Sequence, residues 1–220
     1  MTAPLLPTKA RKDQRLSRLH VLTIFVTLFL VSASAKTLAN DQEGAPALLI
    51  VPDFERPPVS LYLAGSKRTL ATPALINKSG QITYLKSDAL KTPEAWDSFV
   101  KEARDRSLLE LATLDPTMVR DAHGVIQMAV ITTDSPVTAS CILLPGFLQH
   151  FSAIFGPEIL IAIPTHNKIC IFPKLANHLP QMAGAIRDDY LISPKPASTE
   201  IFELSRNGLH AVGSLNPDDE

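Results

Sequence analysis

Glycine is scarce in this sequence, with nine residues in 220. Neither the Gly-x-x-x-x-Gly-Lys-Ser/Thr phosphate loop nor the Gly-x-Gly-x-x-Gly dinucleotide motif occurs, which excludes the usual nucleotide-binding loops. The Gly-x-Ser-x-Gly turn of α/β-hydrolases is missing as well, since Gly65-Ser66 stands outside such a frame. The His-Glu-x-x-His motif of zinc proteases does not occur either. We therefore expect no cofactor, and no catalytic motif is recognisable.

Basic residues are few in the part of the chain that follows the N-terminal segment. Five basic residues and one acidic residue precede Lys36, and removing them from the totals of 21 and 22 leaves 16 basic and 21 acidic residues. The remaining chain thus carries a net charge of about −5. Domains that bind nucleic acids usually carry clustered Lys and Arg, so we expect no nucleic-acid partner.

Only two cysteines are present, Cys141 and Cys170, and no Cys-x-x-Cys redox motif occurs. In an oxidising compartment two cysteines can form one disulfide. Both lie in apolar runs, so the alternative is two separate buried thiols that act as small hydrophobic side chains. Because pairing depends on the distance between the two Cα atoms, the sequence leaves both alternatives open.

The first 35 residues have the three parts of a secretory signal peptide. Residues 1–20 are basic, Val21–Val31 carries no charge, and Ala33 and Ala35 have the small-x-small spacing that signal peptidase reads. We predict cleavage between Ala35 and Lys36, and a periplasmic or secreted mature protein. The alternative is an uncleaved membrane anchor, but the apolar stretch that ends at Ala35 has fifteen residues, whereas a membrane helix needs about 20.

The mature chain divides into three parts by composition. We interpret residues 36–58 as a flexible leader and proline-rich segment, 59–214 as one domain, and 215–220 as an acidic tail. Within the domain, helical patterns stand between pairs of short apolar runs that flank turn signals such as Asn207-Gly208. This order predicts an α+β fold, in which an antiparallel sheet is built from hairpins and two or three helices pack on one face.

Three helices are predicted from apolar spacing and capping residues, the clearest beginning at Thr92 with Pro93 in its first turn. The predicted helices span 93–113, 147–155 and 177–189. Hairpins are expected at 74–85, 158–172 and 200–212, and central strands at 125–131 and 137–144. The run 137–144 is assigned to a strand because apolar and β-branched residues occupy both of its faces.

Several apolar segments follow one another in the second half of the chain. They are Ala139–Pro145, Ile159–Pro164, Ile169–Phe172 and Tyr190–Pro194 with Ile201-Phe202. In this order, and with the helix from Thr92, residues 90–212 resemble the YtpQ-like family of bacterial domains of unknown function. The chain departs from the family at His166-Asn167, where members typically carry a charged pair, and in its export signal. The resemblance implies an α+β fold and implies no reaction.

Asp121 and His123 form a local pair that can orient an imidazole as a general base or metal ligand. They stand in the segment 120–124, where Asp and Gly also favour a turn, and no third ligand has metal-type spacing. His166 lies at a predicted hairpin tip, where exposure to solvent is expected. We keep these three residues as candidates beside the simpler interpretation of turn and surface positions. No catalytic, cofactor-binding or metal residue is assigned.

These observations favour a non-enzymatic exported domain that binds a protein or another component of the cell envelope. Candidate docking features are Pro52–Pro58 and the aromatic residues Phe54, Tyr62, Phe147 and Phe151. Aromatic side chains in a domain of this size more often belong to the core. The alternative is a hydrolase or metal-dependent enzyme that uses the Asp121–His123 loop together with His166. That alternative requires the two loops to lie within about 12 Å of each other.

Overall fold

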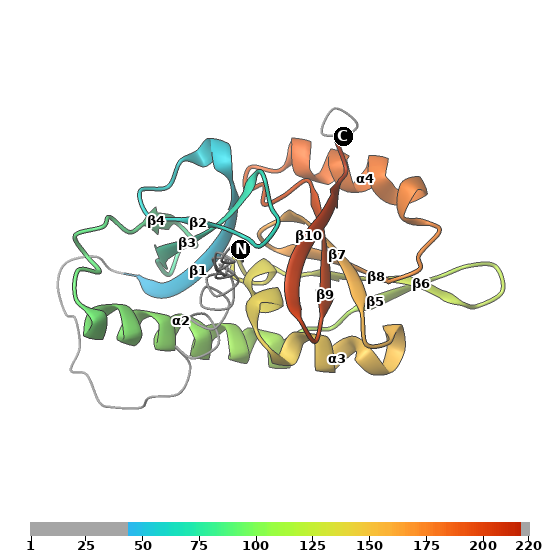
Figure 1. Ribbon diagram of the computed structural model, residues 1–220, viewed down its shortest axis with the longest axis horizontal. Helices are drawn as coiled ribbons and strands as arrows, with labels where there is room; N and C mark the ends of the chain where they lie inside the picture. The colour runs from blue at the N-terminus through green and yellow to red at the C-terminus, as the bar shows by residue number, and fades with distance from the viewer. Residues whose placement is uncertain (1–43, 217–220) are drawn as a thin grey trace, which may run out of the picture. The chain divides into compact units, whose positions relative to one another are not determined.

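The computed structural model describes residues 44–216, so the predicted signal peptide and the Ala35–Lys36 cleavage site lie outside the described residues. Within the described part, three α-helices and two antiparallel β-sheets confirm the predicted α+β fold (Figure 1). Among the helices described, none has the length and apolar character needed to span a bilayer.

The first sheet contains four strands. They are β1 (Ala45–Pro52), β2 (Leu61–Tyr62), β3 (Thr69–Ile76) and β4 (Ile82–Tyr84). β3 pairs antiparallel with each of the other three. The β3–β4 pair confirms the hairpin predicted at 74–85, and Gly80 at its tip has a φ of +79°, which glycine adopts without strain.

β1 corrects the interpretation of residues 36–58 as a flexible leader and proline-rich segment. This strand pairs with β3 from its first residue to its last, and Leu49, Ile50 and Val51 are fully buried. Ile50 packs into the largest core cluster, whereas Leu49 and Val51 contribute to a second cluster on the other side of the strand. The strand tolerates two prolines because it lies at the edge of its sheet.

The second sheet has six strands in the order β10-β9-β7-β8-β6-β5, all antiparallel. They are β5 (Thr117–Arg120), β6 (Ile126–Thr132), β7 (Ile159–Thr165), β8 (Lys168–Pro173), β9 (Glu200–Ser205) and β10 (Gly208–Ser214). The β7–β8 and β9–β10 pairs confirm the hairpins predicted at 158–172 and 200–212. The sequence analysis did not predict β5. This strand has only four residues, of which Thr117 and Val119 are β-branched.

The prediction of a central strand at 137–144 is wrong. This segment instead forms the 3₁₀ helix η2 (Ala139–Leu143), whose first four residues are buried. The Ser140 hydroxyl donates to the Leu48 carbonyl of β1, and Cys141 Sγ lies 3.5 Å from the Ser107 carbonyl oxygen. An apolar run without a clear period fits any buried segment, so the pattern alone could not distinguish strand from helix.

The three helices are α2 (Pro93–Thr113), α3 (Gly146–Phe155) and α4 (Leu179–Ile192), close to their predicted bounds. The Thr92 hydroxyl caps α2 by accepting the Ala95 N–H at 3.2 Å, as predicted. The predicted packing on one face is corrected, because helices cover both faces of the six-stranded sheet, with α3 and α4 on opposite sides (Figure 1).

Alternation along the strands of the second sheet produces this two-sided core. Ile159 and Ile161 of β7 pack with the phenylalanines of α3. Ala162 points to the opposite face of the sheet and packs with Ile186 of α4. The candidate docking residues Phe147 and Phe151 belong to the first of these cores and are fully buried. A central sheet that is covered on both sides explains why its strands are apolar on both faces.

Glu200 joins the two sheets at the start of β9. Its buried carboxylate accepts the Lys67 N–H at 2.7 Å and the Thr69 hydroxyl at 2.6 Å, together with the Ser66 hydroxyl. Nearby Gly65 has a φ of +73°, and a Cβ at this position would lie 2.5 Å from the His210 ring. The turn before β3 is therefore held tightly against β9 and β10.

The two cysteines are free, so the disulfide considered between Cys141 and Cys170 is not formed. Cys141 packs in the core on the α3 side of the six-stranded sheet and Cys170 in the core on the α4 side. Burial raises the pKa of the Cys141 thiol to about 12 and that of the Cys170 thiol to about 11. The structure thus supports the alternative of two separate buried thiols.

The predicted acidic tail, 215–220, begins at a buried residue. Leu215 is 8% exposed and its N–H donates to the Thr199 carbonyl at 2.7 Å. Leu215 therefore belongs to the core beside α4, and residues 217–220 lie outside the described part of the chain.

Candidate ligand-binding cleft

Asp121 and His123 occupy the turn between β5 and β6. Asp121 Oδ1 accepts the backbone N–H groups of His123 at 2.8 Å and Val125 at 2.9 Å, while Oδ2 accepts the Gln127 side-chain amide at 2.8 Å. The Val125 N–H is the main cause that lowers the pKa of the Asp121 carboxyl, supported by the other two donors. His123 is exposed. These contacts support the turn interpretation, because the carboxylate is used by its own loop.

The structure does not bring this turn together with His166. The turn precedes β6, which begins at Ile126, whereas the other end of β6 pairs Thr132 with Lys168, two residues beyond His166. A strand rises about 3.3 Å per residue, so the seven residues of β6 separate the two turns by about 20 Å. The single site proposed for the enzyme alternative is therefore not formed.

His166 is buried, with 2% of its surface exposed, which corrects the expectation of an exposed hairpin tip. Its backbone N–H donates to the Lys195 carbonyl at 3.2 Å, and its own carbonyl accepts the Ala139 N–H at 2.9 Å. The next residue, Asn167, donates from Nδ2 to the Thr133 carbonyl at 2.7 Å. The β7–β8 turn is thus held between η2, the end of β6 and the segment after α4.

The imidazole of His166 has no hydrogen-bond partner at either ring nitrogen among the described residues. Burial, together with the positive charge of Lys195, lowers its pKa to about 4. The ring is therefore neutral at pH 7, with one nitrogen as donor and the other as acceptor. Because both of its ring nitrogens lack a partner, this ring is the least satisfied polar side chain that we find in the described core. An unpaired buried polar group costs about 1–3 kcal/mol.

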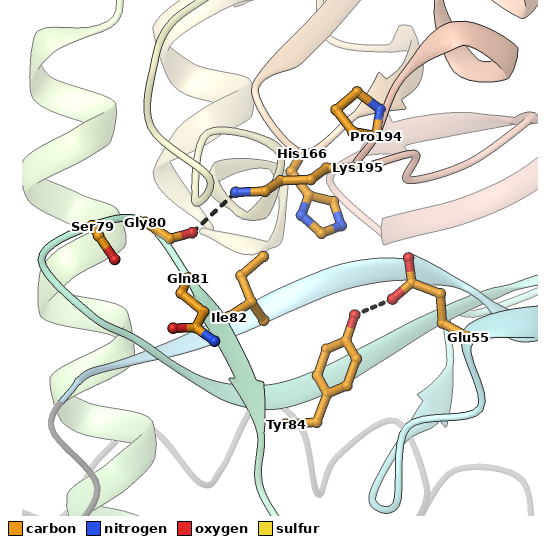
Figure 2. Close-up of a pocket in the computed structure, with 9 residues that line it drawn as sticks. All are labelled: Glu55, Ser79, Gly80, Gln81, Ile82, Tyr84, His166, Pro194 and Lys195. Atoms are coloured by element: carbon orange, nitrogen blue, oxygen red, sulfur yellow. Dashed lines mark hydrogen bonds between the residues drawn. The ribbon is translucent and has the colours of Figure 1, made fainter.

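His166 faces a cleft of about 460 Å³ between the two sheets (Figure 2). The lining residues come from η1 (Asp53–Glu55), the β3–β4 hairpin, the β7–β8 turn and the segment after α4. They are Glu55, Ser79, Gly80, Gln81, Ile82, Tyr84, His166, Pro194 and Lys195. Lys195 Nζ donates to the Gly80 carbonyl at 3.0 Å and so connects the two sides of the cleft.

Tyr84 and Glu55 form a hydrogen-bonded pair on the wall that the first sheet provides (Figure 2). The Tyr84 hydroxyl donates to Glu55 Oε2. Burial is the main cause that raises the pKa of Tyr84, and the Glu55 carboxylate is the second. Glu55 stands just before Arg56, whose φ of +48° is left-handed and unusual for a residue with a side chain. The tight turn at Arg56 directs the chain away from η1 and leaves Glu55 facing Tyr84.

Of the residues that form the cleft, sequence reasoning selected His166 alone, and for the wrong environment. Glu55, Tyr84 and Lys195 carried no motif, because they come from three separate stretches of the chain. The one signal available was the proline-rich segment, which does contain Glu55. Nothing in the local sequence indicated that this segment would face the β7–β8 turn.

Exposed large apolar side chains occur both singly and as pairs of chain neighbours. The pairs among the described residues are Leu61-Tyr62 on β2, Leu108-Leu109 on α2 and Leu191-Ile192 at the end of α4. Phe54 on η1 is 61% exposed, so it and Tyr62 remain available as docking residues. Exposed apolar side chains are therefore present on several elements of the described part of the chain.

Among residues 44–216, no group of three or more His, Cys, Asp or Glu side chains is arranged to hold a metal ion. Comparison of the chain with models of known families, with curated proteins and with solved structures finds no match. The resemblance to the YtpQ-like family stays a prediction.

Proposed function

We propose that this chain is an exported, non-enzymatic binding domain that holds a small polar ligand, or the polar end of an envelope component, in the His166 cleft. The observation that carries the proposal is the buried imidazole whose two ring nitrogens lack partners. A ligand with a donor and an acceptor would satisfy both nitrogens and recover the cost of burying them. The cleft volume of about 460 Å³ falls in the range of small-molecule sites.

The hydroxyl groups of the cleft support binding in preference to chemistry. The Ser79 hydroxyl donates to Asn77 Oδ1 at 2.7 Å within its own turn, and the Tyr84 hydroxyl donates to Glu55. The raised pKa of Tyr84 makes its phenolate harder to form, which disfavours a role as a nucleophile. Both hydroxyl protons are therefore already used in hydrogen bonds within the chain.

Export rests on the signal-peptide pattern of residues 1–35. If it is correct, protein isolated from the producing cells begins at Lys36, and mass spectrometry of its N-terminal peptide identifies that residue. An N-terminal peptide that begins at Met1 or Thr2 would contradict the export proposal. The cleft proposal would be unaffected by that result.

A fragment library screened by ligand-observed NMR tests the cleft. We expect polar fragments that bind the wild-type chain and lose binding in the His166→Phe variant, because phenylalanine fills the ring position without its nitrogens. The matched control is His123→Phe, which changes an exposed histidine in the β5–β6 turn. Binding that survives in His166→Phe, or no binding to the wild-type chain, would contradict the proposed function.

A further inference from the structure

The His166 cleft carries opposite charges on its two sides. Lys195 comes from the segment after α4 and its ammonium reaches the Gly80 carbonyl, Glu55 comes from η1, and both residues line the same space. In Figure 2 the His166 ring lies between Lys195 and the Tyr84–Glu55 pair. A ligand in contact with the ring therefore has a cation on one side and a carboxylate on the other.

The Lys195 side of the cleft fits a carboxylate. The Lys195 ammonium has three donors, and the Gly80 carbonyl takes one of them at 3.0 Å. The neutral His166 ring supplies a further N–H, buried from water. A carboxylate placed here would accept from both groups, and hydrogen bonds between charged partners are the stronger ones.

The Glu55 side of the cleft fits an ammonium group. The Tyr84 hydroxyl donates to one of the two Glu55 oxygens, and the phenolic oxygen keeps its own lone pairs for a donor. An ammonium placed here would donate to the carboxylate and to the phenolic oxygen. The second ring nitrogen of His166 is an acceptor and can take a remaining ammonium proton.

A ligand of one charge sign fits this arrangement less well. An anion without an amine would face the Glu55 carboxylate, and a cation without a carboxylate would face the Lys195 ammonium, and each such contact is repulsive. A ligand that carries both charges pairs each of them with its opposite.

We propose, on the basis of the proposed function, that the ligand of the His166 cleft is a zwitterion of the amino-acid or short-peptide class. Its carboxylate binds Lys195 and His166, and its ammonium binds Glu55 beside Tyr84. The side chain of such a ligand contacts Ile82, which lines the same cleft. The chemistry is shared by free amino acids and by the termini of short peptides.

Isothermal titration with simple zwitterions tests the proposal on the protein isolated from its producing cells. The probes are glycine, β-alanine, 4-aminobutanoate, 6-aminohexanoate and the dipeptide Gly-Gly, which differ in the separation of their charges. We expect the best of them to bind about tenfold more tightly than butanoate or butylamine, which carry one charge each. Equal or tighter binding of either one-charge compound overturns the zwitterion.

Two variants assign the two ends of the ligand. Lys195→Gln should weaken the best zwitterion about tenfold while leaving butylamine binding no weaker, and Lys195→Arg should restore most of the affinity. Glu55→Gln should weaken the zwitterion to the same extent and leave butanoate binding no weaker. An unchanged affinity in both Gln variants overturns the placement of the charges. Urea unfolding of each variant confirms that the fold is retained.

The fragment screen separates this inference from the proposed function. Uncharged fragments that bind through His166, combined with zwitterions that do not bind, would support a ligand cleft and overturn the zwitterion. The absence of any His166-dependent binding overturns both. The relative affinities of glycine and Gly-Gly distinguish the two sources. N-acetylated and C-amidated forms of Gly-Gly check the charges, because loss of binding in both shows that both free termini are required.

Discussion

The chain places a histidine in each of two hairpin turns, and the two turns are stabilised in opposite ways. The β5–β6 turn around His123 is held by Asp121, which accepts N–H groups from within the same loop. The β7–β8 turn around His166 is held by Ala139 and Lys195, which lie far from it in the sequence. A turn that is held by its own residues can leave its histidine in water. A turn that is held by tertiary contacts can keep an imidazole out of water.

The contrast extends to what each turn can bind. In the β5–β6 turn the one carboxylate is already occupied by three donors. In the β7–β8 turn the backbone and Asn167 are occupied, while the imidazole of His166 is left with two unused nitrogens. Rigid surroundings with an unsatisfied group at the centre are typical of a preorganised binding site.

The largest difference between the two turns should appear in acid. The folded chain binds a proton at His166 near pH 4 and the unfolded chain near pH 6.5, so the unfolded state takes up the proton first. Stability contributed by the neutral ring is present above pH 6.5 and is lost as the pH falls from about 6.5 to about 4, by about 3 kcal/mol. Urea unfolding at a series of pH values measures this loss.

The matched variants His166→Gln and His123→Gln sharpen that measurement. His166→Gln should remove most of this loss between pH 6.5 and 4, because no group titrates at that position. His123→Gln, in the exposed turn, should keep the acid dependence of the wild-type chain. Equal acid dependence of the two variants would show that His166 is not buried in its neutral form.

The next effect comes from the side chains that hold each turn. Asn167→Ala removes a hydrogen bond of 2.7 Å to the Thr133 carbonyl and one of 2.8 Å from the Thr165 hydroxyl, at a part-buried site. We expect a loss of about 2 kcal/mol in unfolding free energy by urea titration. Asp121→Ala should cost less, since water can reach the donors that it exposes. A larger loss in Asp121→Ala would reverse the comparison.

The smallest effect should come from glycine in the locally held turn. Gly124 has a φ of +81° and open space around the position of a Cβ, so Gly124→Ala should cost about 1 kcal/mol through backbone strain alone. Gly184→Ala in α4 also meets open space but no positive φ, and should instead stabilise the chain by up to about 1 kcal/mol. Thermal unfolding of the two variants gives the signs, and the same sign in both would contradict the strain argument.

The elements that the sequence predicted well are those with local signals. The cap at Thr92 and the apolar spacing of α2 come from residues within one helix. The β3–β4 turn is held by Asn77, whose Oδ1 accepts the N–H groups of Ser79 and Gln81, and by Gly80. Such signals act between residues close in the sequence and do not depend on which segments pack against the element.

The errors arose where burial determined the structure. The run 137–144 is apolar because η2 is enclosed between β1 and α2, and a buried 3₁₀ helix and a buried strand can have the same composition. Ala45–Pro52 was included in the leader and proline-rich segment, residues 36–58, yet β3 pairs with this strand along its whole length. Tertiary packing overrode the local preference in both places.

The sequence by itself determined the α+β class, the three helices and the hairpins, because caps, turns and alternation act between residues a few positions apart. Only the tertiary structure decided that His166 is buried, that Cys141 and Cys170 stay apart, and that Glu55, Tyr84 and Lys195 surround one cleft. The physical reason is that burial and charge pairing depend on which distant segments meet. The spacing of residues along the chain does not show which distant segments come into contact.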